Sequence, residues 1–293
     1  MIVHDSMDPL PEIHNPVVTV GSFDGVHAGH RAIISRLNVI ASASGGESVL
    51  VTFYPHPRKV LYPETAGKGL AMISTIDEKL LLLEEAGLDH LIILPFTRDF
   101  ARVTSEDFVR EYLVGKLRVH TIVVGFNHHF GHNQEGDYEY LSRARERFHF
   151  HVEEIPEQEI QHETVSSTKI RKALKEGNIQ RANAYLEHHF LVLAEIHEDA
   201  NSSERYRRPV LRLNIRDPEK LVPPPGMYAV RCHGQEWKGL ILSVGGGRLL
   251  LFPVHGNAEP LPGKQVFHFY KRLDRNGELS LKQCLDEAGE LIY

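Results

Sequence analysis

The stretch that decides the fold reads Thr19-Val-Gly-Ser-Phe-Asp-Gly-Val-His-Ala-Gly-His30. The apolar run 17–20 predicts a buried strand, Asp24-Gly25 predicts a tight turn, and a helix is expected to begin near Gly29. In an open parallel sheet, ligands bind beyond the carboxyl ends of the strands, where such a turn lies. Glycines let backbone N–H groups approach phosphate oxygens, and a helix N-terminus favours negative charge. The stretch therefore predicts a phosphate-binding turn.

His27 and His30 add side-chain donors to this turn. Two imidazoles at a helix start can grip a triphosphate and stabilise the charge that builds at its α-phosphorus. A single histidine is more often an ordinary core or surface residue. The pair differs because it lies within a glycine framework directly after an apolar strand, and this context favours a role on a nucleotide.

Strands and helices alternate through the first part of the chain. The pattern predicts strands over 17–20, 48–53, 90–95, 121–125 and 149–155, and helices over 29–43, 76–86, 105–116 and 138–147. Two short helices, 168–176 and 179–186, follow. This alternation predicts a Rossmann-like α/β domain with a parallel sheet covered on both faces.

After His188 the pattern changes to short strands separated by turns. Strands are expected over 191–196, 210–215, 227–232, 236–244, 248–254 and 265–271, with a final helix over 280–288. Pro223-Pro224-Pro225-Gly226 and Gly245-Gly246-Gly247 mark turns between them. We expect a small antiparallel β-barrel. The predicted domains are therefore residues 1–187 and 188–293.

Composition excludes several classes of function. The formal net charge of −6 argues against long nucleic acid as a partner, because phosphate backbones favour a basic surface. No secretion signal and no apolar run long enough to span a membrane is present, so we expect a cytoplasmic protein. Cys232 and Cys284 are too few for a disulfide framework, and the 19 histidines show no zinc-ligand spacing. Oligomeric state is not indicated.

A second candidate phosphate segment covers residues 163–171. Hydroxyls at Ser166, Ser167 and Thr168 can cap the helix that follows, whose exposed N–H groups can bind phosphate. Lys169 and Arg171 place positive charge where a pyrophosphate leaving group needs it. Alone, the segment is an ordinary capped basic helix. Its position after a sheet that carries the histidine pair favours the phosphate-binding interpretation.

These segments resemble the bacterial FAD synthetases, the adenylyltransferase module of bifunctional riboflavin kinase/FAD synthetases. The likeness lies in the family patterns GxFDGxHxGH and SSTxIR, and it extends in the same order to residues 52–61, 124–137 and 171–183. The second of these three stretches, Val124-Gly-Phe-Asn-His-His-Phe-Gly131, is similar to the family's VGxDFRFG but carries His128 and His129 instead. The resemblance implies a nucleotidyltransferase fold followed by a riboflavin-kinase-like barrel.

The resemblance also implies roles for particular residues. It assigns ATP and its phosphates to Gly21, Phe23, Asp24, His27, His30, Ser167, Thr168 and Arg171, the last three as a mobile flap. It assigns the flavin to Phe53, Pro55, His56 and Pro57. Asn127 would hold nucleotide or Mg²⁺, and the residues expected to carry catalysis are His27, His30, Asn127 and Arg171. The implied reaction is FMN adenylyltransfer, in which ATP and FMN give FAD and pyrophosphate.

The barrel departs from the family's kinase pattern. The GFPTAN motif and the later catalytic Glu of an ExHLLDF-like segment are not recognisable, whereas Pro225-Gly-Met-Tyr-Ala-Val230 keeps a scaffold motif. We therefore expect riboflavin kinase activity to be lost. The open alternatives are a bifunctional enzyme, a nucleotidyltransferase acting on another phosphorylated acceptor, and a non-catalytic flavin or nucleotide sensor.

Overall fold

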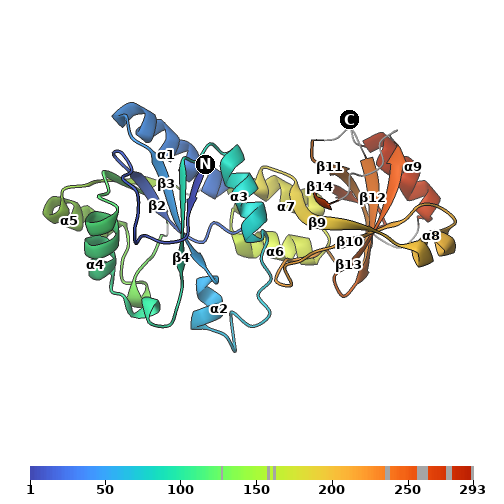
Figure 1. The fold of residues 1–293 in the computed structure, drawn as a ribbon, viewed down its shortest axis with the longest axis horizontal. Helices are drawn as coiled ribbons and strands as arrows, with labels where there is room; N and C mark the ends of the chain where they lie inside the picture. The colour runs from blue at the N-terminus through green and yellow to red at the C-terminus, as the bar shows by residue number, and fades with distance from the viewer. Residues whose placement is uncertain are drawn as a thin grey trace. The chain divides into compact units, whose positions relative to one another are not determined.

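The computed structural model describes residues 1–126, 128–156, 159–160, 163–234, 238–255, 263–274 and 279–291. It divides into two compact units (Figure 1). The first consists of Met1–Leu70 and Leu80–Thr164, and the second of Ala71–Lys79 and Val165–Tyr293. A short segment from the first half of the chain thus belongs to the second unit. The domain boundary between residues 187 and 188 stays a prediction.

A six-stranded parallel sheet forms the centre of the first unit, in the order β1-β4-β3-β2-β5-β6. Its strands are β1 (Ile2–His4), β2 (Val17–Val20), β3 (Ser48–Tyr54), β4 (His90–Pro95), β5 (Thr121–Gly125) and β6 (His151–Ile155). The four residues of β2 are all buried, as expected for a strand covered on both faces. This confirms the predicted parallel α/β fold.

Alternate strand residues point to opposite faces of this sheet. Because apolar residues point to both faces, helices cover both. The helices between β1 and β6 along the chain are α1 (Ala28–Ser44), α2 (Pro57–Leu61), α3 (Ile76–Glu85), α4 (Ser105–Asp107) and α5 (Tyr138–Phe148), with the π-helical segment η2 (Phe108–Lys116) continuing α4. Apolar residues of η2 and α5 share one core cluster with Val18, Val49 and Val124 of the sheet. Helix α1 packs on β2, β3 and β5, and its buried Ile34 and Leu37 lie outside that cluster.

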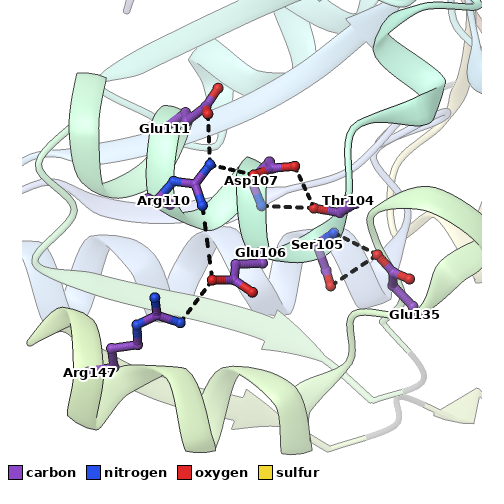
Figure 2. Close-up of polar contacts among 8 residues, drawn as sticks. All are labelled: Thr104, Ser105, Glu106, Asp107, Arg110, Glu111, Glu135 and Arg147. Carbon is purple, nitrogen blue, oxygen red and sulfur yellow. Dashed lines mark hydrogen bonds and ion pairs between the residues drawn. The ribbon is translucent and has the colours of Figure 1, made fainter.

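Polar contacts fix the start of α4 (Figure 2). Thr104 caps the helix by accepting from the backbone N–H of Asp107, as its sequence position predicts. Glu106 accepts from Arg147 of α5 at 2.8 Å. The Glu135 carboxylate accepts from both the N–H and the hydroxyl of Ser105, at 2.9 and 3.4 Å. The Glu135 contacts join the loop after β5 to the start of α4, and the Arg147 contact joins α5 to α4.

A closed antiparallel barrel forms most of the second unit, with strand order β10-β13-β12-β11-β14-β9. Its strands are β9 (Phe190–Glu198), β10 (Leu211–Asn214), β11 (Gly226–Cys232), β12 (Lys238–Gly245), β13 (Arg248–His255) and β14 (Gly263–Arg272). Helices α6 (Ser167–Lys175) and α7 (Ile179–Leu186) precede it, and α9 (Leu281–Leu291) packs on β11, β12 and β13 (Figure 1). The predicted barrel and both helices before it are confirmed.

Some elements differ from the sequence prediction. The edge strand β1 and the helix α8 (Ala200–Tyr206) were not predicted, and two short paired strands, β7 (Glu159–Ile160) and β8 (Glu163–Thr164), also appear. The helix predicted over 105–116 is mostly a π-helix. Helix α8 begins at Asp199, whose side chain accepts from the N–H of Ser202 at 2.9 Å. The sequence of helix α8 is too short and too polar to show helical periodicity.

Within the described part of the chain, no helix has the length and apolar character that a membrane span requires. The two cysteines, Cys232 and Cys284, are both buried and free.

Candidate functional site

The turn after β2 has an unusual backbone. Gly25 has φ +86°, and Phe23 and Val26 have φ +45° and +41°. Positive φ is costly for residues with a β-carbon and above all for a β-branched valine. Val26 is fully buried and Phe23 nearly so, which shows that surrounding packing holds the turn in this shape. Such strain at the carboxyl end of a central strand is typical of a binding site.

Three aromatic rings are stacked at this turn. The rings of His27 and His30 have centroids 3.6 Å apart with planes inclined by 17°. Phe23 lies next to His30, with centroids 4.3 Å apart and planes inclined by 21°. His27 is the N-cap residue of α1, and His30 is in its first turn. The structure therefore brings together the histidine pair and Phe23, three of the residues predicted to contact ATP.

The N-terminus of α1 supplies a favourable field for an anion. This helix has 17 residues, and its first turn contains no acidic side chain. The aligned peptide dipoles place a partial positive charge at this end, and the first N–H groups lack partners within the helix. Gly21 precedes the turn, and its N–H donates to the carbonyl of Val51 on β3 at 3.0 Å. The predicted Asp24 is buried in the same turn.

The predicted flavin residues lie at the carboxyl end of β3. Phe53 is half-buried and forms an aromatic cluster with Phe96 and Phe100, at centroid distances of 5.5 and 5.7 Å. His56 caps α2 by accepting from the N–H of Arg58, and Pro57 is the first residue of that helix. Pro55 is exposed between them.

Sequence reasoning missed two exposed aromatic residues at the same edge of the sheet. Tyr54 ends β3 and is 49% exposed, and Phe126 follows β5 and is 53% exposed. Both strands are neighbours of β2 in the sheet, so these rings flank the strand that carries the histidine turn. An aromatic residue directly after an apolar strand is the signal that could have identified them.

Several residues of the stretch 124–137 have structural roles. A β-carbon on Gly131 would lie 2.7 Å from the backbone nitrogen of Ser105, and one on Gly136 would lie 2.7 Å from the Phe130 ring. Asp137 caps α5 by accepting from the N–H of Tyr140 at 2.8 Å. The predicted Asn127 lies outside the described residues.

The next residue, His128, is partly buried. Its ring stacks on that of Phe130, with centroids 5.8 Å apart. Burial and the neighbouring His129 lower the pKa of His128 to about 4. The ring is therefore neutral near pH 7, so it does not act as a cationic partner for phosphate in this state.

Residues 165–171 of the second predicted phosphate segment belong to the second unit. Ser166 caps α6 by accepting from the N–H of Lys169 at 3.3 Å, as the sequence predicts. Ser167 is half-buried and Thr168 exposed in the first turn, which contains no acidic residue. Arg171 is 8% exposed, and its Nε donates to the carbonyl of Ala71 at 2.9 Å. The guanidinium is thus held in a fixed direction.

A cavity of about 1210 Å³ lies in the second unit. Residues of β9, α8 and β10, of the segment 215–222 and of the β12–β13 hairpin line it, among them Arg212, Asn214, Asp217, Lys220 and Arg248. None of the residues predicted from the sequence to bind ATP or flavin is among its lining residues.

No group of three or more His, Cys, Asp or Glu side chains in the described ranges is arranged to hold a metal ion. Many histidines instead occur in pairs: His4 with His90, His120 with His151, and His233 with His268.

Residues 10–169 match the FAD synthetase family. The chain is 32% identical to the bifunctional riboflavin kinase/FMN adenylyltransferase of Pseudomonas fluorescens over 232 residues, which cover 78% of this chain and 73% of that protein. It is 30% identical to the protein of the same name from Escherichia coli (strain K12) over 218 residues, 74% of this chain and 68% of the relative.

A solved structure described as a macrolide-efflux protein from Streptococcus pneumoniae superposes with a TM-score of 0.81 at 23% identity. The superposition covers 99% of this chain and 96% of that one, so the two share a fold. The family match spans more than half of the sequence, including the histidine turn. The chain therefore belongs to the FAD synthetase family and is an enzyme of the nucleotidyltransferase class.

Proposed function

We propose that this chain transfers the adenylyl group of ATP to FMN, giving FAD and pyrophosphate. The observation that carries the proposal is the stack of Phe23, His30 and His27 at the N-terminus of α1, within the residues that match the family. The names of the relatives include the same activity.

The chemistry suits these residues. A phosphomonoester has a second pKa of about 6, so the FMN phosphate is largely dianionic near pH 7 and needs no general base to attack. One of its oxygens forms a bond to the α-phosphorus of ATP. The bond from that phosphorus to the bridging oxygen breaks, and pyrophosphate leaves with the electron pair. The enzyme must align the two phosphates and offset their charge.

His27 and His30 are proposed to carry this charge stabilisation. Each imidazole offers an N–H donor, and the α1 N-terminus adds backbone donors and a partial positive charge. Arg171 is proposed to bind the departing pyrophosphate, with Ser167 and Thr168 on the same phosphates. A guanidinium held by Ala71 loses little additional freedom when it binds, which favours a role in positioning phosphate.

The exposed aromatic residues support a flavin acceptor. A flavin ring system needs flat apolar surface, and Phe53, Tyr54 and Phe126 supply it at the carboxyl edge of the sheet. Pro55, His56 and Pro57 form the rigid turn between β3 and α2. These six residues form the proposed flavin site.

Mg²⁺ is proposed as the metal. It usually keeps several waters and binds through substrate phosphates with one or two protein oxygens, so the lack of a three-ligand cluster in the described ranges fits this mode. Asn127 would supply such an oxygen, and Asp24 is the nearest carboxylate in sequence to the histidine pair. When bound, the metal neutralises phosphate charge.

The second part of the proposal is that the barrel has lost riboflavin kinase activity. Phosphorylation of an alcohol needs a base. Glu198, Asp199 and Asp217 are the carboxylates among the described residues that line the barrel cavity. Asp199 caps α8 and pairs with Arg248, and the Ser202 N–H lowers its pKa. Asp217 accepts from the N–H of Glu219. With its lowered pKa, Asp199 is a weak base.

A bifunctional enzyme is the second candidate, favoured by the large cavity in the barrel and by the names of the relatives. One assay separates the two. Purified protein is incubated with ATP, Mg²⁺ and either FMN or riboflavin, and the flavins are resolved by chromatography. We expect FAD from FMN and no product from riboflavin. FMN formed from riboflavin would establish the second candidate, and absence of FAD from FMN would refute the main proposal.

Gly21→Ala tests the packing of the histidine turn. A β-carbon at this position would lie 3.0 Å from two atoms of the Phe23 ring, so the ring must shift and disturb its stack with His30. We expect kcat/KM for ATP to fall about tenfold, because small displacements of phosphate-binding groups are costly. Thermal unfolding should change little. The matched control is Gly289→Ala in helix α9, where the backbone φ is not positive and the nearest atom to an added β-carbon is a methyl of Val254 at 3.3 Å. Unchanged kcat/KM in Gly21→Ala would show that the stack is not needed.

A further inference from the structure

Glu78 and Lys220 form an ion pair whose side chains are fully buried, with Nζ and Oε2 2.6 Å apart. Both residues belong to the second unit, although 141 residues separate them in sequence. Taking two charges out of water is costly unless further hydrogen bonds satisfy them. The pair therefore needs a full set of partners.

Both charged groups have such a set. Lys220 Nζ donates to Glu78 and also to the carbonyls of Ile73 and Leu191, at 2.6 and 2.7 Å. An ammonium has three N–H donors, so these contacts use all of them. The Glu78 carboxylate also accepts from the N–H groups of Thr75 and Leu193, at 2.9 and 2.8 Å.

The side-chain contacts of Glu78 and Lys220, together with two backbone hydrogen bonds, join the segment 71–79 to the barrel. The N–H of Met72 donates to the carbonyl of Glu219 at 2.7 Å, and the N–H of Leu221 donates to the carbonyl of Met72 at 2.8 Å. Lys220 lies between these two backbone bonds and binds the carbonyl of Ile73. Residues 72 and 73 are thus fixed by the loop that precedes β11.

Ala71 precedes residues 72 and 73, and its carbonyl accepts from Nε of Arg171. The Ala71 carbonyl therefore sets the direction of the Arg171 guanidinium. The Glu78–Lys220 pair holds this carbonyl in place through its contact with Ile73, with only Met72 between the two residues. An exposed contact also joins this segment to the barrel: Lys264 Nζ lies 2.9 Å from Asp77, with side chains 45% and 55% exposed. Exposed pairs of this kind contribute little.

We propose that Glu78 and Lys220 are positioning residues for adenylyl transfer, which orient Arg171 on the phosphates of ATP through the segment 71–73. The inference rests on the proposed function, because it takes Arg171 as a phosphate ligand. It also gives the barrel a role in the reaction that does not require kinase activity.

The test uses the double variant Glu78→Gln/Lys220→Met in the full-length protein, which removes both charges together and leaves neither one buried alone. We expect the KM for ATP to rise about tenfold and the KM for FMN to stay within about twofold of the wild type. A general loss of structure would change both constants. Lys264→Ala, which removes only the exposed contact, is the matched control and should change neither.

A double-mutant cycle with Arg171→Ala shows whether the Glu78–Lys220 pair acts through Arg171. If the pair acts through Arg171, adding Glu78→Gln/Lys220→Met to Arg171→Ala raises the KM for ATP no further. If the increases in the KM for ATP caused by Arg171→Ala and by Glu78→Gln/Lys220→Met multiply in the combined variant, the proposal is overturned. An unchanged KM for ATP in Glu78→Gln/Lys220→Met would also overturn it. If the double variant fails to fold, Glu78→Asp, which keeps the charge one methylene further away, is measured in the same way.

Hydrogen exchange gives a readout that does not depend on turnover. In Glu78→Gln/Lys220→Met, the backbone amides of residues 70–76 and 166–175 should exchange about tenfold faster, and those of 17–34 should be unchanged. Unchanged exchange over 166–175 would overturn the positioning role. Absence of FAD formation by the wild type would refute the proposed function instead, so the two failures are distinguishable.

Discussion

His30→Ala is expected to lower the kcat of FAD formation by roughly 100- to 1,000-fold while the affinity for FMN changes by no more than about twofold. The ring lies in the first turn of α1, between Phe23 and His27 in the stack. A donor placed there acts on charge that develops at the α-phosphorus, and it contributes little to binding of the acceptor. Removing it therefore affects the transition state far more than the ground state.

The kcat is measured by steady-state kinetics, and FMN binding is monitored through the quenching of flavin fluorescence. His151→Ala is the matched control, because His151 belongs to another histidine pair of the same unit and is exposed. It should leave kcat unchanged. Equal losses of kcat and FMN affinity in His30→Ala would mean that the histidine holds the flavin side of the site.

The stability of the barrel is expected to fall by about 2 kcal/mol between pH 7 and pH 5 because of His268. Burial lowers the pKa of this histidine to about 4, with further contributions from His233, His189, His188 and Arg231. The Nε2 atom of His268 lies 3.0 Å from Nδ1 of His233. The unfolded chain, with a histidine pKa of about 6.5, binds more protons than the folded chain between these values. Stability is therefore full above pH 6.5, falls as the pH drops, and levels off below about pH 4.

Urea unfolding at pH 7 and pH 5 measures this effect. His268→Gln removes the titrating group and should reduce the pH-dependent loss by about 2 kcal/mol. The exposed His151→Gln serves as the control and should keep the wild-type dependence. The same pH dependence in His268→Gln and the wild type would show that burial of this ring does not govern the acid sensitivity of the barrel.

Local sequence signals predicted much of the fold because they act over short distances. The apolar run of β2, the turn at Asp24-Gly25 and the hydroxyl cap at Ser166 each specify their own conformation, and the structure has all three. Elements without such signals were missed. The edge strand β1 has three residues, and its position depends on pairing with β4, which lies far along the chain.

The candidate site was predictable to a similar extent. His27 and His30 are three positions apart at a helix start, so their proximity follows from the geometry of one turn. Tyr54 and Phe126 are far apart in sequence, and only the strand order of the sheet places them on either side of β2. The contact of Arg171 with Ala71 has no sequence signal, because it joins a helix to a loop 100 residues earlier.

The sequence by itself determined the parallel α/β fold, the antiparallel barrel and the turn and helix start from Gly21 to His30, because periodicity, glycine and helix capping are local properties. Tertiary structure alone decided that the rings of Phe23, His30 and His27 stack, and that segment 71–79 belongs to the unit that contains the barrel. It also decided that Glu78 and Lys220 are buried together. The physical reason is that burial, and the partners a buried charge requires, depend on residues brought together from distant parts of the chain.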